Sequence, residues 1–423
     1  MDYDIPSGTR PREREENTLR VLDVLIKHGP ISRIDLSRKL GVARSTVSVI
    51  VNGLIEIGLV NEIGEQEIVG AGRPPTLLEI DATSRQFVCV DLDVGETSIV
   101  LCDLEGKVMA AKVDVMARAT PEIVAREIID SVTELLEREN LDWATVAGVG
   151  VVVPGPVRHD IDTVQSLVFG WPQPVKLQAE LRKCLPEGIP LLAENDVNAA
   201  AFAEWDAIGY PPDLFYVYVG RGIGSAYIYD GRLHYGRHFL AGEIGHMTVE
   251  SDGVLCDCGN RGCLEKHASV PCIIAAIHGE SALDRGRAYY QSSLFNLVRQ
   301  LESGDSRSLA VVNEAGHAIG AALYNVIQVL DCEKIVLSGP ICMLRDYIMD
   351  VIKLNLTKQL GRGTLSLAFS QVGEDAKAIG IASLMREAIL LNTGGGDDTP
   401  FGYLGTKGAE RLLRAVPKEG QGT

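Results

Sequence analysis

The sequence lacks any apolar run long enough to cross a membrane. Its 423 residues begin with a polar segment, M-D-Y-D-I-P-S-G-T-R, which has no apolar core of the kind found in secretory signal peptides. Positive charge is also scarce, because 40 Lys and Arg stand against 57 Asp and Glu, a net charge of −17. These absences predict a cytoplasmic protein with no membrane insertion. The charge argues against broad nonspecific affinity for nucleic acids, but it is compatible with one small basic surface.

A disulfide framework is absent as well. Six of the nine cysteines are scattered through mainly apolar surroundings, as expected of small core residues in a reducing compartment: Cys89, Cys102, Cys184, Cys272, Cys332 and Cys342. The other three lie together in residues 242–265, which read G-E-I-G-H-M-T-V-E-S-D-G-V-L-C-D-C-G-N-R-G-C-L-E. This short segment therefore needs an explanation of its own.

Residues 242–265 combine one imidazole with three thiols, a ligand set typical of zinc. We predict a four-coordinate ion with no open position, held by His246, Cys256, Cys258 and Cys263. The backbone can turn tightly around it at three glycines, Gly253, Gly259 and Gly262. Such a zinc would be structural and would fix the two flanking carboxylates, Glu243 and Glu265. The alternative is a group of buried or redox cysteines beside an ordinary core histidine.

The N-terminal part of the chain has the pattern of three short helices followed by two strands. Residues 1–15 are polar and charged, and we expect them to be flexible. Apolar spacing predicts helices over about 17–28, 33–40 and 44–57, with Ser32 as the cap of the second helix and Ile34, Leu36 and Leu40 on its apolar side. A glycine turn at 41–43 precedes the third helix, and residues 59–80 would form a two-stranded wing. We predict a winged helix-turn-helix domain over residues 16–82.

In this arrangement the third helix enters the major groove of DNA. The wing tip, G-A-G-R-P-P at 70–75, presents one arginine that suits a narrow minor groove. The predicted DNA-binding residues are Arg44, Ser45, Thr46, Ser48, Asn52 and Arg73. The alternative is a small helical interaction domain with a solvated Arg/Ser/Thr face, and the nearly balanced charge of the segment is the main point in its favour.

From about residue 86 the pattern changes to alternating strands and helices. Strands at 87–92 and 98–103 are joined by a glycine-containing turn, and strands at 215–219 and 225–229 repeat this design. We expect helices at 121–139, 310–330 and 376–391, a segment at 194–205 that opens as a loop and continues as a helix, and a buried strand at 146–153. Two such halves predict an internally duplicated α/β fold with a cleft between two lobes.

Three motifs in this region together resemble those of the ROK family (repressor, open reading frame, kinase). They are E-N-D-V-N-A at 194–199, G-E-I-G-H at 242–246 and C-D-C-G-N-R-G-C-L-E at 256–265. The resemblance extends from the helix-turn-helix to about Leu391, and the DNA-binding domain makes the chain similar to the xylose-repressor and N-acetylglucosamine-repressor branch. It implies a two-lobed, actin- and hexokinase-like fold (a ribonuclease H-like duplication) in a sugar-binding domain over residues 83–392. One lobe would comprise about 83–195 with the C-terminal helix and the other about 196–375, followed by a disordered tail at 393–423.

The resemblance also implies roles for single residues. The family's sugar-contacting positions match Asn195, Asp196, Glu243, His246 and Glu265, and its zinc ligands match the four predicted above. Amides and carboxylates suit sugar hydroxyls, and His246 could bind zinc through one nitrogen and a sugar oxygen through the other. In family kinases the position of Asp196 is the general base, which would be a vestigial catalytic residue here. Asp196 could also be only the N-cap of the following helix.

The turns that would hold ATP depart from the kinase pattern. Family kinases carry D-x-G-G-T after the first strand, whereas residues 91–97 read D-L-D-V-G-E-T, with Asp93 and Val94 at the glycine positions. Side chains there hinder the close approach of phosphates, and Asp93 and Glu96 would repel them. In the second turn, G-R-G-I-G at 220–224, Arg221 stands where threonine is usual, and Pro340 occupies a glycine position in the third. We therefore expect a degenerate nucleotide site without bound Mg-ATP.

These observations predict a sugar-responsive transcriptional repressor and not an enzyme. A homodimer or tetramer would place its winged helices on a palindromic operator, and a sugar or sugar phosphate between the lobes would change the affinity for that DNA. The alternative is an active ATP-dependent hexose kinase with a fused DNA-binding domain, against which the 91–97 turn argues. A further alternative is regulation by a protein partner, such as a sugar-transport component, with no sugar bound.

Overall fold

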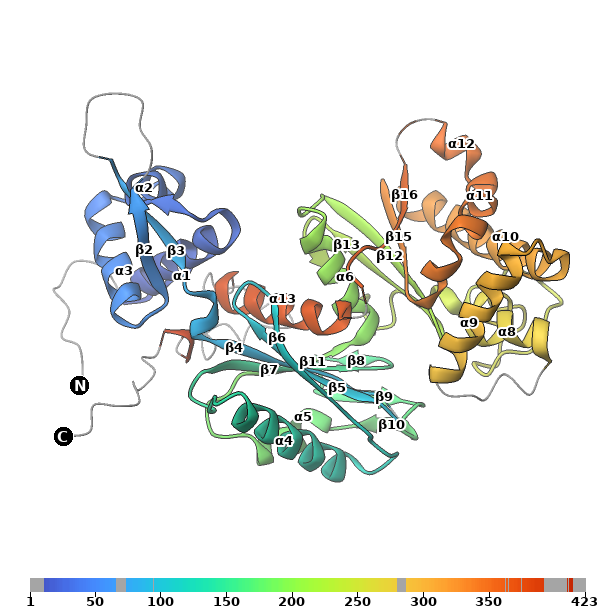
Figure 1. Ribbon diagram of the computed structural model, residues 1–423, viewed down its shortest axis with the longest axis horizontal. Helices are drawn as coiled ribbons and strands as arrows, with labels where there is room; N and C mark the ends of the chain where they lie inside the picture. The colour runs from blue at the N-terminus through green and yellow to red at the C-terminus, as the bar shows by residue number, and fades with distance from the viewer. Residues whose placement is uncertain are drawn as a thin grey trace. The chain divides into compact units, whose positions relative to one another are not determined.

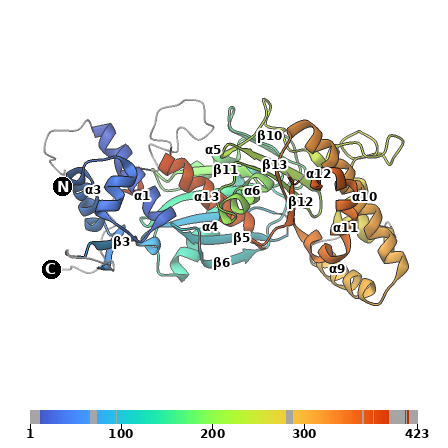
Figure 2. The same ribbon diagram turned by 90° about the horizontal axis from the view of Figure 1, so that it is seen from above.

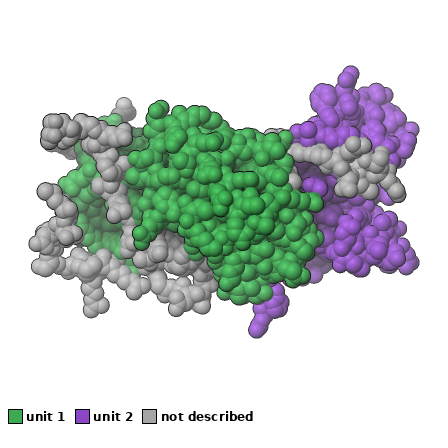
Figure 3. Space-filling model, turned by 90° about the horizontal axis from the view of Figure 1, so that it is seen from below, with its two compact units in different colours: residues 1–194, 381–423 green, residues 195–380 purple. Residues whose placement is uncertain are grey.

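The chain forms two compact units in a computed structural model, whose helices and strands are labelled in Figure 1. The structure describes residues 11–65, 74–93, 95–279, 287–361, 363, 365–373, 375–391, 409 and 411–413. The first unit comprises residues 1–194 and 381–423, and the second comprises residues 195–380 (Figure 3). The lobe boundary expected after residue 195 and the observed unit boundary differ by one residue. The chain passes between the units a second time within its last long helix.

The first unit begins with a winged helix-turn-helix. Its elements are α1 (Pro11–His28), β1 (Ile31–Ser32), α2 (Arg33–Leu40), α3 (Arg44–Glu56), β2 (Val60–Glu65) and β3 (Thr76–Ile80). Ser32 caps α2 by accepting a hydrogen bond from the Asp35 N–H, which confirms the prediction. Gly41 ends the helix with a φ of 67°, in the left-handed region that favours glycine. Leu36 and Val47, from α2 and α3, are fully buried.

Three details of this domain differ from expectation. The first helix begins at Pro11 and not at residue 17, because proline is tolerated in a first helical turn and R-E-R-E-E consists of good helix formers. A third strand, β1, pairs with β3 and extends the wing sheet to the order β1-β3-β2. Ile34 is 38% exposed, so burial on α2 depends on Leu36. Residues 1–10 and most of the wing tip, with the predicted DNA contact Arg73, lie outside the described residues.

A five-stranded sheet organises the rest of the first unit. Its strands lie in the order β11-β7-β4-β5-β6, and β4 pairs antiparallel with β5 and parallel with β7. Their bounds are β4 (Gln86–Asp91), β5 (Thr97–Asp103), β6 (Val108–Asp114), β7 (Val146–Val153) and β11 (Leu191–Asn195). Helices α4 (Pro121–Arg138) and α5 (Leu177–Cys184) cover one face, and α13 (Ala376–Leu391) lies on the other (Figure 1). A small sheet contains β8 (Val157–Arg158), β9 (Thr163–Ser166) and β10 (Trp171–Val175).

Two glycines in β7 let α13 pack directly on this sheet. A Cβ at Gly148 would lie 2.3 Å from Met385 Cε, and one at Gly150 would lie 2.4 Å from Ile381 Cγ1. In the strand sequence V-A-G-V-G-V-V-V, the two glycines therefore face α13, and valines of the strand are buried in the core.

The C-terminal tail corrects one expectation. Residues 393–423 are expected to be disordered, yet Arg411 donates hydrogen bonds to the backbone oxygens of Val146 (2.7 Å) and Trp143. Ala409 and Leu412 are buried. The glycine-rich composition of the tail hides this short apolar turn, because the average over the segment is polar. The other residues of the tail lie outside the described part of the chain.

The second unit repeats the strand plan of the first. Its sheet has the order β14-β13-β12-β15-β16, and β12 pairs antiparallel with β13 and parallel with β15. The bounds are β12 (Asp213–Val219), β13 (Ile223–Tyr229), β14 (Arg232–Leu233), β15 (Lys334–Ser338) and β16 (Ser366–Phe369). In both units a hairpin is joined by a third strand that runs parallel to the hairpin's first strand. The predicted internal duplication is therefore confirmed.

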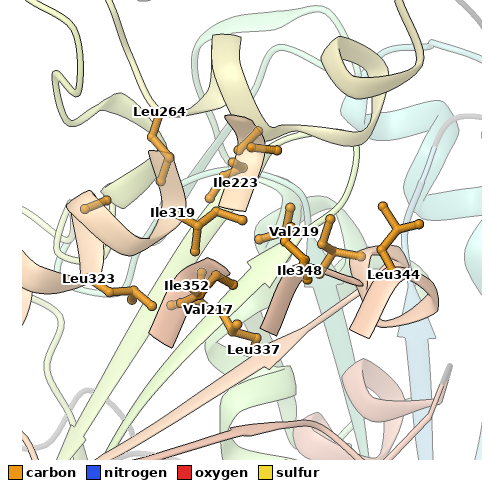
Figure 4. Close-up of a cluster of buried hydrophobic side chains, with 14 of the residues drawn as sticks. Val217, Val219, Ile223, Leu264, Ile319, Leu323, Leu337, Leu344, Ile348 and Ile352 are labelled. Atoms are coloured by element: carbon orange, nitrogen blue, oxygen red, sulfur yellow. The ribbon is translucent and has the colours of Figure 1, made fainter. Parts of the chain in front are cut away.

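Helices cover both faces of the second sheet. On the face that includes Gly224 lies α6 (Asp196–Ala207). On the face that includes Val217 lie α7 (Glu265–Ala268), α8 (Val270–His278), α9 (Arg287–Glu302), α10 (Ser306–Leu330), α11 (Arg345–Asn355) and α12 (Thr357–Leu360). Helices α10 and α11 run side by side in both views (Figures 1 and 2). Their side chains, among them Ile319 and Ile348, form one cluster with Val217 of β12 and with Leu264 (Figure 4). Within the described part of the chain, every helix is too short or too polar to span a membrane.

Candidate functional site

The four predicted zinc ligands lie together in the second unit. The donor atoms of His246, Cys256, Cys258 and Cys263 are all within 4.8 Å of one another. Cys256 Sγ is 3.7 Å from His246 Nδ1, and Cys258 Sγ is 3.7 Å from Cys263 Sγ. A tetrahedral ion with metal–sulfur bonds of about 2.3 Å has ligands about 3.8 Å apart, so this donor set fits zinc.

Protons and a metal would compete for these sulfurs. Loss of hydration and the neighbouring thiols raise the pKa of Cys263 to about 12, whereas a backbone hydrogen bond from Asn260 lowers the pKa of Cys258. Because the thiolate is the form that binds metal, a divalent cation bound here would displace the thiol protons.

One glycine and one asparagine shape the loop around these donors. Gly262 has a φ of 65°, and a Cβ there would lie 1.7 Å from the Glu250 carbonyl oxygen, so a side chain cannot be placed without moving the loop. Asn260 Nδ2 donates to Thr248 Oγ1 at 2.9 Å and lies 3.6 Å from Cys263 Sγ. Asn260 is not among the residues predicted from the sequence, although its place between the last two cysteines in C-G-N-R-G-C is a usable signal.

The two ring nitrogens of His246 face different groups. Nδ1 faces the cysteines, and Nε2 lies 3.8 Å from Glu243 Oε2. Loss of hydration raises the pKa of Glu243, His246 lowers it, and the charges of Glu265 and Asp196 raise it further. The imidazole therefore lies between the thiol cluster and Glu243, whose pKa also responds to the charges of Glu265 and Asp196.

Three successive residues at the start of β13 bring the sequence motifs together. The Ile223 N–H donates to Glu265 Oε2 at 3.0 Å, and the Ser225 N–H donates to the Gly242 oxygen at 2.8 Å. Between them, Gly224 packs against the first turn of α6, where a Cβ would lie 3.0 Å from a valine methyl group. The motifs that begin at residues 194, 242 and 256 therefore converge on one strand end.

Helix α6 is capped by Asn195 and not by Asp196. Asn195 Oδ1 accepts hydrogen bonds from the backbone N–H groups of Val197 at 2.9 Å and Asn198 at 3.1 Å. The N-cap role considered for Asp196 is therefore wrong. The other end of the Asn195 amide, Nδ2, lies 3.4 Å from Asp196 Oδ1, so the two predicted sugar-contacting residues are adjacent.

Asp196 forms an ion pair with Lys377, a residue that is not among those predicted from the sequence. Lys377 Nζ lies 3.0 Å from Asp196 Oδ2, and the two side chains are only 18% and 14% exposed. Lys377 belongs to the first turn of α13, where the helix dipole disfavours a positive charge. A lysine at the start of a buried helix is the signal that could have indicated an acidic partner.

Packing within the protein explains the glycines of the 220–224 turn. A Cβ at Gly220 would lie 2.6 Å from Tyr218 Cε1, and one at Gly339 would lie 2.9 Å from Tyr218 Cε2. A Cβ at Gly222 would lie 2.8 Å from Glu265 Oε2. The Tyr218 ring thus fills the space between the two turns that the resemblance places on the nucleotide side.

The remaining nucleotide-side turn, residues 91–97, lies in the first unit and is closed by its own threonine. Thr97 Oγ1 donates to the Asp93 carbonyl oxygen at 2.9 Å and lies 3.3 Å from the Asp93 nitrogen. Gly95 has a φ of 94°, and its N–H donates to the Met116 oxygen at 2.8 Å. Val94 lies outside the described residues.

Four of the predicted DNA-contacting residues, Arg44, Ser45, Ser48 and Asn52, share one side of α3, and Thr46 lies at its edge. Arg44, Ser45 and Asn52 are exposed, and Thr46 and Ser48 are half-buried. Val49, which is not among the predicted contacts, is 53% exposed at a spacing that puts it beside Ser45 and Asn52. An exposed valine at this position suits the methyl group of a thymine.

Arg33 holds the recognition helix against the wing. Its Nη1 donates to Asn52 Oδ1 at 2.9 Å and to the Ser48 backbone oxygen at 3.3 Å, and its Nη2 lies 2.8 Å from Glu62 Oε1 in β2. The Asn52 carbonyl is therefore used within the domain, and the amide NH₂ is the group that would reach a base edge.

Comparison with known proteins agrees with this geometry. A family model described as "ROK family" matches residues 87–388, and one described as "Winged helix-turn-helix DNA-binding" matches residues 14–61. The xylose repressor of Bacillus spizizenii is 29% identical over 385 residues, which cover 89% of this chain and 96% of the repressor. The N-acetylglucosamine repressor of Escherichia coli O6:H1 is 26% identical over 395 residues, which cover 89% of this chain and 94% of that protein.

Solved structures give the same result. A ROK family transcriptional regulator described as a homologue of the Escherichia coli Mlc protein matches with a TM-score of 0.76 and 25% identity. The match covers 94% of this chain and 100% of that one. Since the family model also spans well over half of the sequence, the chain belongs to the ROK family, with a winged helix-turn-helix DNA-binding domain at its N-terminus.

Proposed function

We propose that this protein is a sugar-responsive, DNA-binding transcriptional repressor without kinase activity. The observation that carries the proposal is the presence in one chain of a winged helix-turn-helix and a ROK domain, in an order matched along 89% of the chain by proteins named as repressors. The winged helix would bind operator DNA, and the ROK domain would bind the sugar that controls this binding.

The sugar is proposed to bind against the residues gathered at the start of β13, namely Asn195, Asp196, Glu243, His246 and Glu265. Carboxylates accept hydrogen bonds from hydroxyls, and the Asn195 amide can donate one. A structural zinc on His246 and the three cysteines would hold the loop that presents Glu243 and Glu265. The 3.7 Å separations of the donor atoms support zinc binding.

Two contacts support the absence of kinase chemistry. Asp196 stands at the position of the kinase general base, but its carboxylate is held by the Lys377 ammonium at 3.0 Å, so a substrate proton would have to compete with that cation. The Tyr218 ring occupies the space between Gly220 and Gly339, where close approach of phosphates depends on empty glycine positions. A bound triphosphate would have to move this ring.

A homodimer or tetramer is part of the proposal. A single winged helix reads only one half-site, and a two-fold symmetric pair reads a palindromic operator whose half-sites are about 34 Å or a multiple of it apart. The net charge of −17 makes binding at random DNA sites weak, so that the contacts on α3 decide where the protein binds.

A coupled ADP-release assay combined with calorimetry tests this function. The intact protein is titrated with D-xylose, N-acetylglucosamine and D-glucose and then supplied with Mg-ATP. We expect heat from at least one sugar and no turnover. Turnover at an ordinary enzyme rate, about 1 per second or faster, would contradict the proposal and favour a sugar kinase. Binding heat from none of the sugars would favour control by a protein partner.

A further inference from the structure

Helix α13 carries an ion pair near each of its ends. Near its start, Lys377 pairs with Asp196 at 3.0 Å. Near its end, Glu387 Oε1 lies 2.9 Å from the Nζ of Lys27, which belongs to α1 of the winged helix-turn-helix. From residue 377 to residue 387 the helix rises by about 15 Å. One helix therefore joins a residue of the proposed sugar site to the DNA-binding domain.

Between the two ion pairs, α13 is tightly packed. A Cβ at Gly380 would lie 1.7 Å from the Ala199 backbone oxygen, so α13 rests directly on the backbone of α6. Ile381 and Met385 press against the two glycines of β7. Helix α13 is continuous from Ala376 to Leu391, so Lys377 and Glu387 belong to one hydrogen-bonded element. A displacement at Lys377 can therefore be passed along this helix to Glu387.

A sugar and Lys377 would use the same carboxylate. The oxygens of Asp196 accept either the ammonium of Lys377 or the hydroxyls of a sugar. In the first turn of α13 the helix dipole disfavours the positive charge of Lys377, so Asp196 supplies compensation that a bound sugar would take away. Lys377 Nζ already lies over the Tyr218 ring, 5.6 Å from its centroid, so this cation–π contact would remain when a sugar takes the carboxylate.

The ion pair between Lys27 and Glu387, at the other end of α13, would respond to a movement of this helix. The side chains of Lys27 and Glu387 are 20% and 10% exposed, and Lys27 also contacts Asp23 of α1 at 2.9 Å. Although burial lowers the pKa of Lys27, its two carboxylate partners raise it above the ordinary value. Ion pairs withdrawn from solvent are screened less than surface pairs, so a shift of Glu387 changes the forces on α1 directly.

We propose that Lys377 is a further effector-binding residue and that α13 couples the sugar site to the winged helix. In the sugar-free protein, Lys377 holds Asp196. A bound sugar takes the oxygens of Asp196, Lys377 turns from Asp196 to the sugar beside Tyr218, and α13 moves Glu387 against Lys27. The inference rests on the proposed function, because it requires a sugar at Asp196.

Hydrogen–deuterium exchange on the intact protein tests the coupling without a sugar. Lys377→Met removes the ammonium and keeps the length of the side chain. In the wild-type background we expect Lys377→Met to make exchange in residues 17–28 about fivefold faster. In the Glu387→Gln background we expect Lys377→Met to cause no such increase. Equal increases in the two backgrounds would overturn the proposal.

Two further variants keep this comparison interpretable. Lys27→Met breaks the same ion pair from its other partner, and it should remove the response to Lys377→Met just as Glu387→Gln does. Glu134→Gln breaks an ion pair with Lys112 in the same unit but away from α13, and it should leave the response unchanged. If Lys27→Met preserves the response, or if Glu134→Gln removes it, the pathway through α13 is wrong.

A second arm uses D-xylose and N-acetylglucosamine as probes. A sugar that binds the wild-type protein should change exchange in residues 17–28. In Glu387→Gln it should bind with an affinity within about twofold of wild type and leave these residues unchanged. A full response in Glu387→Gln would overturn the coupling. If neither sugar binds, the proposed function fails for these sugars, and the sugar-free comparison still decides the coupling.

Discussion

Single residues at this site serve two neighbours at once. His246 faces the thiols with one nitrogen and Glu243 with the other. Glu265 accepts a hydrogen bond from the Ile223 N–H, and Asn195 caps α6 while its amide nitrogen faces Asp196. A substitution at any of these positions therefore changes the loop or helix as well as the group offered to a ligand.

Gly262→Ala tests how closely the metal-ligand loop is packed. The new Cβ would lie 1.7 Å from the Glu250 oxygen at a φ of 65°, so we expect a loss of about 3 kcal/mol or more in the free energy of unfolding. The matched control is Gly259→Ala in the same loop, where φ is 90° and the Cβ meets nothing within 4 Å. It should cost only about 1 kcal/mol. Urea denaturation measures both, and equal losses would show that the Glu250 contact is unimportant.

Cys258→Ala tests whether a metal supports the sugar site. We expect loss of bound zinc, a lower melting temperature and weaker sugar binding, because the loop that presents Glu243 and Glu265 loosens. Cys184→Ala, at another exposed cysteine, should change none of the three. Elemental analysis and calorimetry provide the readouts. Zinc loss with unchanged sugar affinity would separate the metal from the site.

At the scale of secondary structure elements, the site is an assembly of helix and strand ends. The start of β13 holds the three motifs, and the first turns of α6 and α13 meet through Asp196 and Lys377. Helix and strand ends carry unpaired backbone groups and exposed side chains, which is why they can be shaped for a ligand without disturbing the core.

Asn195→Ala separates helix capping from sugar binding. Loss of this N-cap should cost about 1 kcal/mol of stability. Asp305→Ala removes the N-cap of α10, which accepts from the Ser308 N–H, and should cost a similar amount. Only Asn195→Ala should also weaken sugar binding in calorimetry. If both variants bind sugar equally well, Asn195 has a structural role alone.

Arg44→Ala tests the recognition helix. We expect weaker binding to operator DNA and unchanged affinity for sugar, because Arg44 is exposed at the N-terminus of α3, where phosphates and bases would lie. Arg38→Ala is the control, since its exposed guanidinium pairs with Asp35 on α2. A gel-shift titration in which Arg44→Ala and Arg38→Ala behave alike would contradict this orientation of α3.

Local patterns were sufficient to predict some elements of this fold and not others. The cap at Ser32, the recognition helix and the His/Cys cluster depend on residues close in sequence, so their spacing is informative. Lys377 and Asp196 are distant in sequence, and although a lysine in the first turn of a buried helix calls for an acidic partner, no local pattern identifies that partner as Asp196. The short strand β1 and the packed turn at Arg411 have the same cause, because each exists only through a partner far along the chain.

At the scale of the whole molecule, two units with the same strand order carry different functional parts. The first carries the DNA-binding domain, and the second carries the metal-ligand cluster and the proposed sugar residues. The net charge of −17 opposes contact with DNA, so operator affinity has to come from a small face of α3 and the wing. A modest change that a sugar causes in the DNA affinity of that face is then enough to change how much of the operator is occupied.

The most direct test measures the affinity for DNA with and without sugar. The intact protein is used to capture genomic DNA fragments, and the tightest fragment is titrated by fluorescence anisotropy in the absence and presence of a saturating sugar identified by calorimetry. We predict that the sugar changes the Kd for this fragment by about fivefold or more. An unchanged Kd, with the sugar demonstrably bound, would contradict the account.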